Sequence, residues 1–237
     1  MSTIQQEFDR IALVSEDGST QNDHYHNFLL RHLPPNCHDA LEIGCGKGGF
    51  ARRLAEHSQR VLALDLSPEM IRIARERSTQ FPNIDFQLAD ISDRPLTDQS
   101  FDCIATIATL HHIPIEETLL KIKAALKPGG VLLVLDLFEP ARVSKSLRAG
   151  PSASLVAGLS DSLLNLLAIP VSVSLRFIHQ GRLLPRREVR AAWQAHERHD
   201  SYATMPEVHA LCARILPGAI IRKHLLWRYS IVWKKPA

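Results

Sequence analysis

The sequence predicts an α/β protein built on a mostly parallel β-sheet, and two observations carry that prediction. Apolar runs typical of strands alternate with helical runs between residues 21 and 137. That alternation is the pattern of a parallel sheet covered by helices on both faces. Near the C-terminus the strand-like runs 219–225 and 227–233 follow too closely for a crossover helix, so they must pair antiparallel. We therefore expect five parallel strands closed by an antiparallel pair.

Each element of this pattern has its own local signal. Buried or alternating apolar residues predict strands over five ranges: 39–44, 60–66, 84–90, 101–108 and 131–138. Helices are expected over 48–59, 67–77, 115–126 and 204–216. Ser67 is placed to cap the second of these, with Pro68 at its first position. Thr204 and Glu207 have capping-box spacing at the start of the last one.

The chain is expected to be a single domain, residues 1–237, with an insertion. Residues 21–137 form the regular core, and residues 201–237 add the last helix and the antiparallel strands. Residues 139–200 have no place in the alternation and are interpreted as a helical lid. The apolar half of this lid, residues 154–175, could cover a lipophilic acceptor or form the face of a homodimer.

Composition limits the classes of function. A hydrophobic content of 45% and a charged content of 22% are those of an ordinary soluble globule. The net charge of +3 is too small to indicate a nucleic-acid partner. The four cysteines form no C-x-x-C pair, the N-terminus is polar, and the longest weakly charged stretch is interrupted by polar residues. We therefore expect a cytoplasmic protein without a membrane span.

The stretch LEIGCGKGGF, residues 41–50, is the most informative part of the sequence. Gly44, Gly46 and Gly49 satisfy the G-x-G-x-x-G pattern of dinucleotide-binding turns. Asp65, about 20 residues on, stands where a carboxylate receives ribose hydroxyls in those enzymes. A phosphate-binding P-loop is excluded, because Gly48 rather than Ser or Thr follows Lys47. These residues alone leave a nicotinamide cofactor and S-adenosylmethionine both open.

An ordered set of motifs favours the second cofactor. LEIGCGKG resembles the E/D-x-G-x-G-x-G motif of class I S-adenosylmethionine-dependent methyltransferases, and LDLSPEMI is similar to their D-x-S-x-x-M stretch. FDCIATIATLHHI and LKPGGVLLVLD resemble the blocks of the fourth and fifth strands. The resemblance, to methyltransferase domains of types 11 and 25, covers about residues 24–137. It implies a Rossmann-like three-layer αβα sandwich, whose seven-stranded, mostly parallel sheet has an antiparallel terminal strand.

The resemblance also implies a binding site for S-adenosylmethionine, with S-adenosylhomocysteine as product. Glu42 suits the cationic methionine end, which Gly44, Cys45, Gly46 and Gly48 would line, and Asp65 would take both ribose hydroxyls. Leu66 and Met70 would pack on the adenine, Asp90 and Ile91 would meet its amine side, and Ile107 would face the cofactor. In the plainer alternatives Met70 is only helix core and Asp90 only a turn residue.

The acceptor is narrowed by motifs that are absent. The chain has no N-P-P-Y or D-P-P-Y after the fourth strand, no Pro-Cys dipeptide, and no basic stripe rich in aromatic residues. A small-molecule acceptor is therefore expected. His111, in the pair that follows the fourth strand, is the candidate general base; in the alternative, both histidines only shape the pocket.

Other readings stay open beside this one. His196 and His199 lack a convincing third ligand, so no metal is expected. Tyr25 could touch the methionine end of the cofactor, although ordinary helix packing explains its segment as well. The competing functions are an NAD-dependent oxidoreductase and a non-catalytic, methyltransferase-like binding module.

Overall fold

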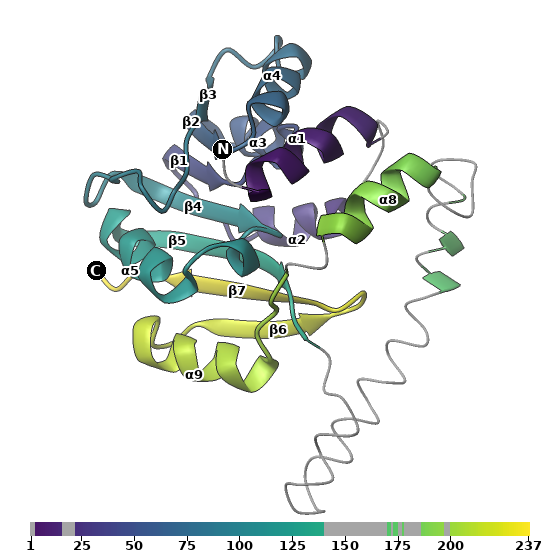
Figure 1. Cartoon of the computed structure of the whole chain (residues 1–237). Coiled ribbons are helices and arrows are strands. Elements are labelled where there is room, and N and C mark those ends of the chain that lie inside the picture. Colours follow the sequence, from purple (N-terminus) through teal and green to yellow (C-terminus); the bar gives the residue numbers. More distant parts are fainter. Residues whose placement is uncertain are drawn as a thin grey trace, which may run out of the picture.

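A computed structural model describes residues 3–15, 22–139, 170–171, 173–174, 177, 186–196 and 200–237. One seven-stranded sheet, in the order β3-β2-β1-β4-β5-β7-β6, organises these residues (Figure 1). Its parallel strands are β1 (Cys37–Ile43), β2 (Ser58–Asp65), β3 (Ile84–Leu88), β4 (Phe101–Ile107) and β5 (Leu126–Leu137). The expected α/β fold with a mostly parallel sheet is confirmed.

The C-terminal strands close the sheet as expected. β7 (Arg228–Lys234) runs antiparallel to β5, and β6 (Ile220–His224) runs antiparallel to β7. The strand order changes direction between β1 and β4. From β1 the chain proceeds to β2 and β3 toward one edge of the sheet, and from β4 it proceeds to β5 toward the other edge. In open α/β sheets, ligands bind beyond the carboxyl ends of the strands at such a switch point. The topology alone therefore gives the position at which a site should be sought.

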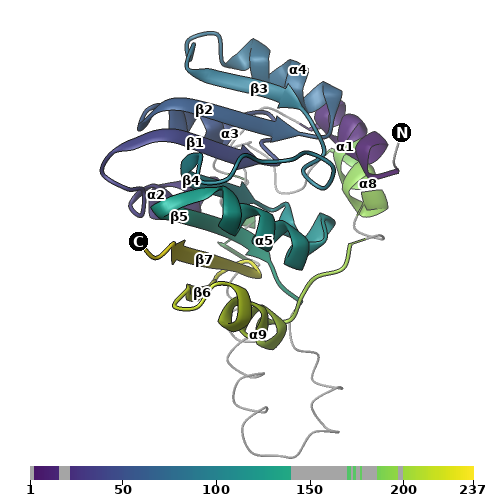
Figure 2. The same ribbon diagram turned by 90° about the vertical axis from the view of Figure 1, so that its left-hand side faces the viewer.

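Helices cover both faces of the sheet, because alternate residues of the buried strands are apolar on each side. α2 (His26–Leu30), α3 (Gly49–Ala55) and α4 (Pro68–Arg77) pack on one face, where Leu29, Leu54 and Ala74 are buried. α5 (Ile115–Ala125) and α9 (Met205–Ile215) pack on the other face, where Leu119 and Val208 are buried (Figure 2). Two short 3-10 helices, η1 (Asp23–Tyr25) and η2 (Leu110–His112), complete this part of the fold.

Two further helices lie beside each other at the end of the sheet toward which the parallel strands point (Figure 1). They are α1 (Thr3–Val14) and α8 (Arg187–His196). Ile11 and Ala12 of α1 share a buried cluster with Ala192 of α8 and with Met70 of α4. The sequence analysis did not predict α1, although its apolar residues recur at helical spacing.

The predicted caps are confirmed, and two element bounds are corrected. The Ser67 hydroxyl accepts the backbone N–H of Met70 at 3.1 Å, and the Thr204 N–H donates to Glu207 Oε2 at 2.8 Å. The helix expected over 48–59 ends at Ala55, because the chain from Ser58 pairs with β1. The expected loop at 127–130 belongs to β5, which pairs from Leu126 onward around an irregularity in register.

The lid expected over residues 139–200 is represented among the described residues mainly by α8. α8 and the residues from 200 onward belong to the described chain, whereas the apolar segment 154–175 lies almost wholly outside it. No helix among the described residues is long and apolar enough to cross a membrane.

Candidate cofactor site

A cavity lies at the carboxyl ends of β1, β2 and β4, at the switch point of the sheet. Its lining comes from the turn after β1, the end of β2, the segment after β3, the segment after β4, and α1. The lining residues are Phe8, Ile43, Gly44, Gly46, Leu64, Asp65, Leu66, Met70, Ala89, Asp90, Ile91, Ile107, Ala108, Thr109, His112 and Ile113. Eight of the eleven cofactor-binding residues expected from the sequence are in this set.

The glycine turn after β1 has a backbone that side chains would not tolerate. Gly44 has a φ of +73°, and a Cβ atom there would lie 2.1 Å from Thr109 Oγ1. Gly46, also left-handed at +51°, donates its N–H to Asp65 Oδ2 at 2.7 Å. Glycine adopts this conformation without steric cost and lets the backbone itself form the cavity wall.

Asp65 connects this turn to the end of β2. Its second oxygen, Oδ1, accepts the N–H of Ser67 at 2.9 Å, so both oxygens are held in place by backbone donors. Burial raises the pKa of Asp65, and the hydrogen bonds from Ser67 and Gly46 oppose that rise. Each carboxylate oxygen has a second lone pair. Asp65 can therefore accept two further hydrogen bonds from a ligand in the cavity.

Apolar residues and a second carboxylate line the next part of the cavity. Met70 belongs both to the lining and to a buried cluster, so its helix-core role and its pocket role coexist. Asp90 is exposed, and its Oδ1 accepts the N–H of Ser92 at 2.8 Å, which is the turn role foreseen as the alternative. Its position in the lining leaves that carboxylate available to a ligand as well.

Three expected residues stand behind the lining. Glu42 is 2% exposed; burial raises its pKa well above the usual range, and Asp65 adds to that rise. Its Oε2 has no hydrogen-bond partner among the described residues. Cys45 is buried, and Gly48, with a φ of +76°, caps α3 against the ring of Phe86. These residues support the turn from behind.

The opposite wall is built by the segment that follows β4. Ala108 is held at a φ of +51°, a conformation uncommon for a residue with a Cβ atom. His112 lines the cavity, whereas His111 does not. The Nδ1 atom of His111 lies 2.6 Å from Asp136 Oδ1, and its backbone N–H donates to Asp136 Oδ2 at 3.1 Å. Burial, and then the neighbouring His111, lower the pKa of His112 to about 3.

Sequence reasoning missed several residues around the cavity. Phe8 lines it from α1, and Thr109 fills the space opposite Gly44. Asp136, at the end of β5, and Asp200, after α8, contact the histidine pair. An acid at the end of a buried parallel strand is a signal that could have identified Asp136. Tyr25 does not line the cavity; its hydroxyl donates to the Leu225 carbonyl at 3.0 Å, which is the packing alternative.

The charges of the lining bear on which cofactor it fits. Asp65 and Asp90 line the cavity, and no Lys or Arg does so among the described residues. A pyrophosphate would therefore meet carboxylates, whereas a ligand carrying a sulfonium and an ammonium would not be repelled. The residues present fit S-adenosylmethionine, for which Asp65 would hold the ribose and the glycine turn the methionine portion.

Comparison with known proteins agrees with this geometry. Residues 41–134, which span β1 to the middle of β5, match the family model described as Methyltransferase domain. This part of the chain is therefore similar to a methyltransferase domain. A demethylmenaquinone methyltransferase of Tropheryma whipplei is 33% identical over 141 residues, which are 59% of this chain and 58% of that protein. An uncharacterized methyltransferase of Mycobacterium bovis is 28% identical over 218 residues, 91% of this chain and 96% of the relative.

A solved structure superposes on the whole chain and supports the same fold. The N-methyltransferase NodS from Bradyrhizobium japonicum, solved with S-adenosylhomocysteine, superposes with a TM-score of 0.60 over 100% of both chains at 17% identity. The Rossmann-like three-layer arrangement expected from the sequence is thereby confirmed.

Proposed function

We propose that this protein is an S-adenosylmethionine-dependent methyltransferase that methylates a small molecule. The observation that carries the proposal is the pairing of Asp65 with the Gly46 turn. It holds a carboxylate at the end of β2, with each oxygen fixed by a backbone N–H, beside a cavity wall made of bare backbone. The sequence match to methyltransferase domains supports the same activity.

The acceptor is proposed to enter on the side of the cavity opposite Asp65. Phe8, Ile113 and His112 are the lining residues proposed to receive it, two apolar side chains and an imidazole. A relative whose name specifies demethylmenaquinone supports an acceptor of the same general kind, a small and mainly apolar molecule. The lining gives no support to an extended, polyanionic acceptor, because its charged groups are carboxylates.

The proposed reaction is a direct displacement at the methyl carbon of S-adenosylmethionine. A lone pair of the acceptor attacks the methyl carbon while the carbon–sulfur bond breaks and its electron pair passes to sulfur. The protein must align the two groups and exclude water, and these effects supply much of the rate. The role of His111 as a general base stays a prediction. A proton leaving the acceptor would have to reach it past His112, which lies closer to the cavity.

The activity can be tested with methyl-labelled S-adenosylmethionine and a panel of demethylated quinones and aromatic hydroxyl compounds. We expect label transfer and formation of S-adenosylhomocysteine with at least one member, and loss of both in Asp65→Ala. Asp98→Ala, which removes an exposed acid outside the cavity, is the matched control and should keep the activity. Label transfer that is equal in Asp65→Ala and wild type would contradict the proposed site.

A further inference from the structure

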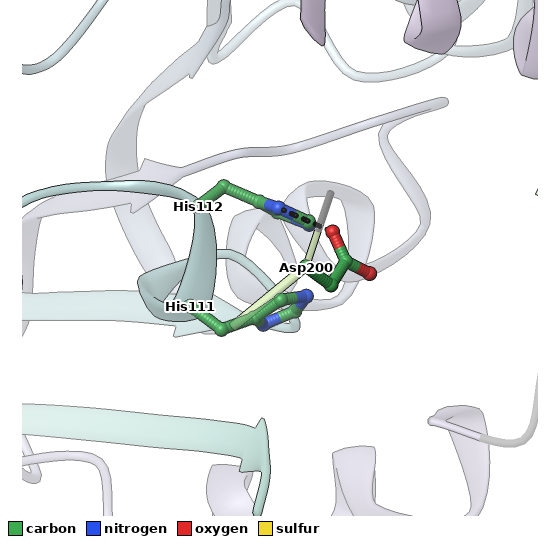
Figure 3. Close-up of side chains that lie close together, drawn as sticks. All are labelled: His111, His112 and Asp200. Carbon is green, nitrogen blue, oxygen red and sulfur yellow. Dashed lines mark ion pairs between the residues drawn. The ribbon is translucent and has the colours of Figure 1, made fainter. Parts of the chain in front are cut away.

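Beside the cofactor cavity, the fold gathers imidazole and carboxylate groups from three separate parts of the chain. His111 and His112 come from η2, His196 from the end of α8, and Asp200 from the segment that follows it. We call these four residues the histidine cluster. Figure 3 shows the imidazoles of His111 and His112 with the Asp200 carboxylate beside them. The side chains of all four are at most 7% exposed.

The spacing within the histidine cluster differs from that of a hydrogen-bonded network. Asp200 Oδ1 lies 3.3 Å from His112 Nδ1 and 3.7 Å from His196 Nε2. His196 Nε2 is buried and has no hydrogen-bond partner among the described residues. An unpaired polar atom in such a position costs about 1–3 kcal/mol. His112 and Asp200 are thus at ion-pair distance, while the His196 nitrogen beside them has no hydrogen-bond partner among the described residues.

The same spacing suits groups that share a metal ion. Ligand atoms of His111, His112 and Asp200 all lie within 4.8 Å of one another. Nitrogen and oxygen ligands about 2.1 Å from a tetrahedral zinc ion are roughly 3.4 Å apart. The 3.3 Å between His112 and Asp200 already matches that value, and the other distances in this trio are at most 4.8 Å.

The outer partners of the cluster also match those of metal ligands. His111 Nδ1 lies 2.6 Å from Asp136 Oδ1, and His196 Nδ1 lies 2.9 Å from Glu7 Oε2. Metal-binding histidines usually give one ring N–H to a carboxylate, which leaves the lone pair of the other nitrogen for the metal. Asp200 is likewise fixed, because the Tyr202 hydroxyl donates to its Oδ2 at 2.7 Å.

The local charge favours a cation. Glu7, Asp136 and Asp200 bring three carboxylates to three imidazoles, each side chain at most 14% exposed. Arg228 lies close enough to Asp136 to offset part of that charge, and Asp200 faces both His112 and His196. Buried charges are tolerated when they are paired or when they coordinate a metal.

We propose that the histidine cluster binds one divalent transition-metal ion of the zinc type. Imidazole and carboxylate ligands without thiolate suit such an ion. The sequence analysis expected no metal, because it considered only His196 with His199, and His199 lies outside the described residues. The partners supplied by the fold, His111 and His112, are more than 80 residues away in sequence.

The place of the ion deepens the proposed function, and this step rests on that function. His112 belongs both to the cluster and to the cavity lining, so the ion faces the side assigned to the acceptor. An acceptor hydroxyl that joined the ion as a fifth ligand would lose its proton to solvent at lower pH. Its oxygen lone pair would then form the bond to the methyl carbon, while the carbon–sulfur pair passes to sulfur. The products are a methyl ether and S-adenosylhomocysteine.

Metal binding can be measured without the acceptor. The full chain is stripped with a chelator and titrated calorimetrically with ZnCl₂, and separately with CoCl₂ while visible absorption is recorded. We expect one equivalent of zinc, and for cobalt the absorption of a site of low coordination number. His112→Ala and Asp200→Asn should each weaken zinc binding more than about 100-fold, since even second-shell changes cost 10–100-fold. The exposed His57→Ala is the matched control and should bind as wild type does.

Circular dichroism and thermal melting show whether each variant is folded. If the variants do not fold, wild-type stoichiometry and the cobalt spectrum decide the question by themselves. No stoichiometric zinc uptake by wild type overturns the proposal, and so does uptake that is unchanged in both variants. If zinc is not bound but Asp200→Asn lowers the melting temperature, the cluster is a latch between α8 and η2. Zinc uptake without methyl transfer would retain the site and reject the proposed function.

Discussion

Replacement of Asp65 gives a graded prediction, because its two oxygens are expected to hold two ribose hydroxyls. Both oxygens are fixed by backbone donors at 2.7 and 2.9 Å. A hydrogen bond to a charged group contributes about 1.5–3 kcal/mol, so two contribute at least about 3 kcal/mol. At about 1.4 kcal/mol for each tenfold change, Asp65→Ala should weaken binding of S-adenosylhomocysteine at least ~100-fold. Asp65→Asn keeps one acceptor oxygen, and the loss expected for it is nearer ~10-fold.

Isothermal titration calorimetry with S-adenosylhomocysteine measures these losses, and Asp98→Ala serves as the control. Circular dichroism and thermal melting show whether each variant is folded. Because burial raises the pKa of Asp65, its ionised form is disfavoured by folding at neutral pH. Asp65→Asn removes that charge but sets its NH2 group against one of the two backbone N–H donors, so its melting temperature should fall below that of wild type. Folded variants that both bind S-adenosylhomocysteine within about twofold of wild type would refute the assignment of Asp65.

Three further predictions concern the turn and the packing around it. Gly44→Ala should abolish binding of S-adenosylhomocysteine and lower the melting temperature, because its Cβ would overlap Thr109. Adding Thr109→Gly should restore both in part. The recovery should be incomplete, because the left-handed φ still costs about 1–2 kcal/mol. A single variant that melts as wild type does would contradict this. The raised pKa of Glu42 means that wild type loses stability as pH rises above about 4.3. Glu42→Gln lacks this titration, so its melting temperature minus that of wild type should increase between pH 5 and pH 8. A difference that stays constant over this range would contradict the raised pKa. Glu207→Ala removes the acceptor of two hydrogen bonds from Thr204 and should lower the free energy of unfolding, measured in urea, by about 1 kcal/mol; no loss would exclude a stabilising cap.

The sequence predicted the sheet well, because its strands are recognisable without their neighbours. The run that ends at Asp65 is apolar on both faces, and the capped helix after it begins at Pro68. The close spacing of β6 and β7 forces their antiparallel pairing whatever surrounds them. Most of the cavity follows from these features, because its walls come directly after strands whose order the motifs imply.

The residues that were missed depend on tertiary packing. Phe8 becomes a cavity residue only because α1 packs against α4 and α8. Asp200 meets His112 across 88 positions of sequence, and no local pattern records that contact. The contact of His111 with Asp136, and the place of His112 rather than His111 in the cavity lining, likewise depend on the tertiary fold.

The central claim is that the cavity beside the glycine turn binds S-adenosylmethionine, and titration of the wild-type chain tests it most directly. S-adenosylmethionine, S-adenosylhomocysteine and NAD are each added to the same preparation in a calorimeter. The two carboxylates of the lining and its lack of a described Lys or Arg predict binding of both sulfur compounds at one equivalent, and none of NAD. Binding of NAD without either sulfur compound would contradict the claim.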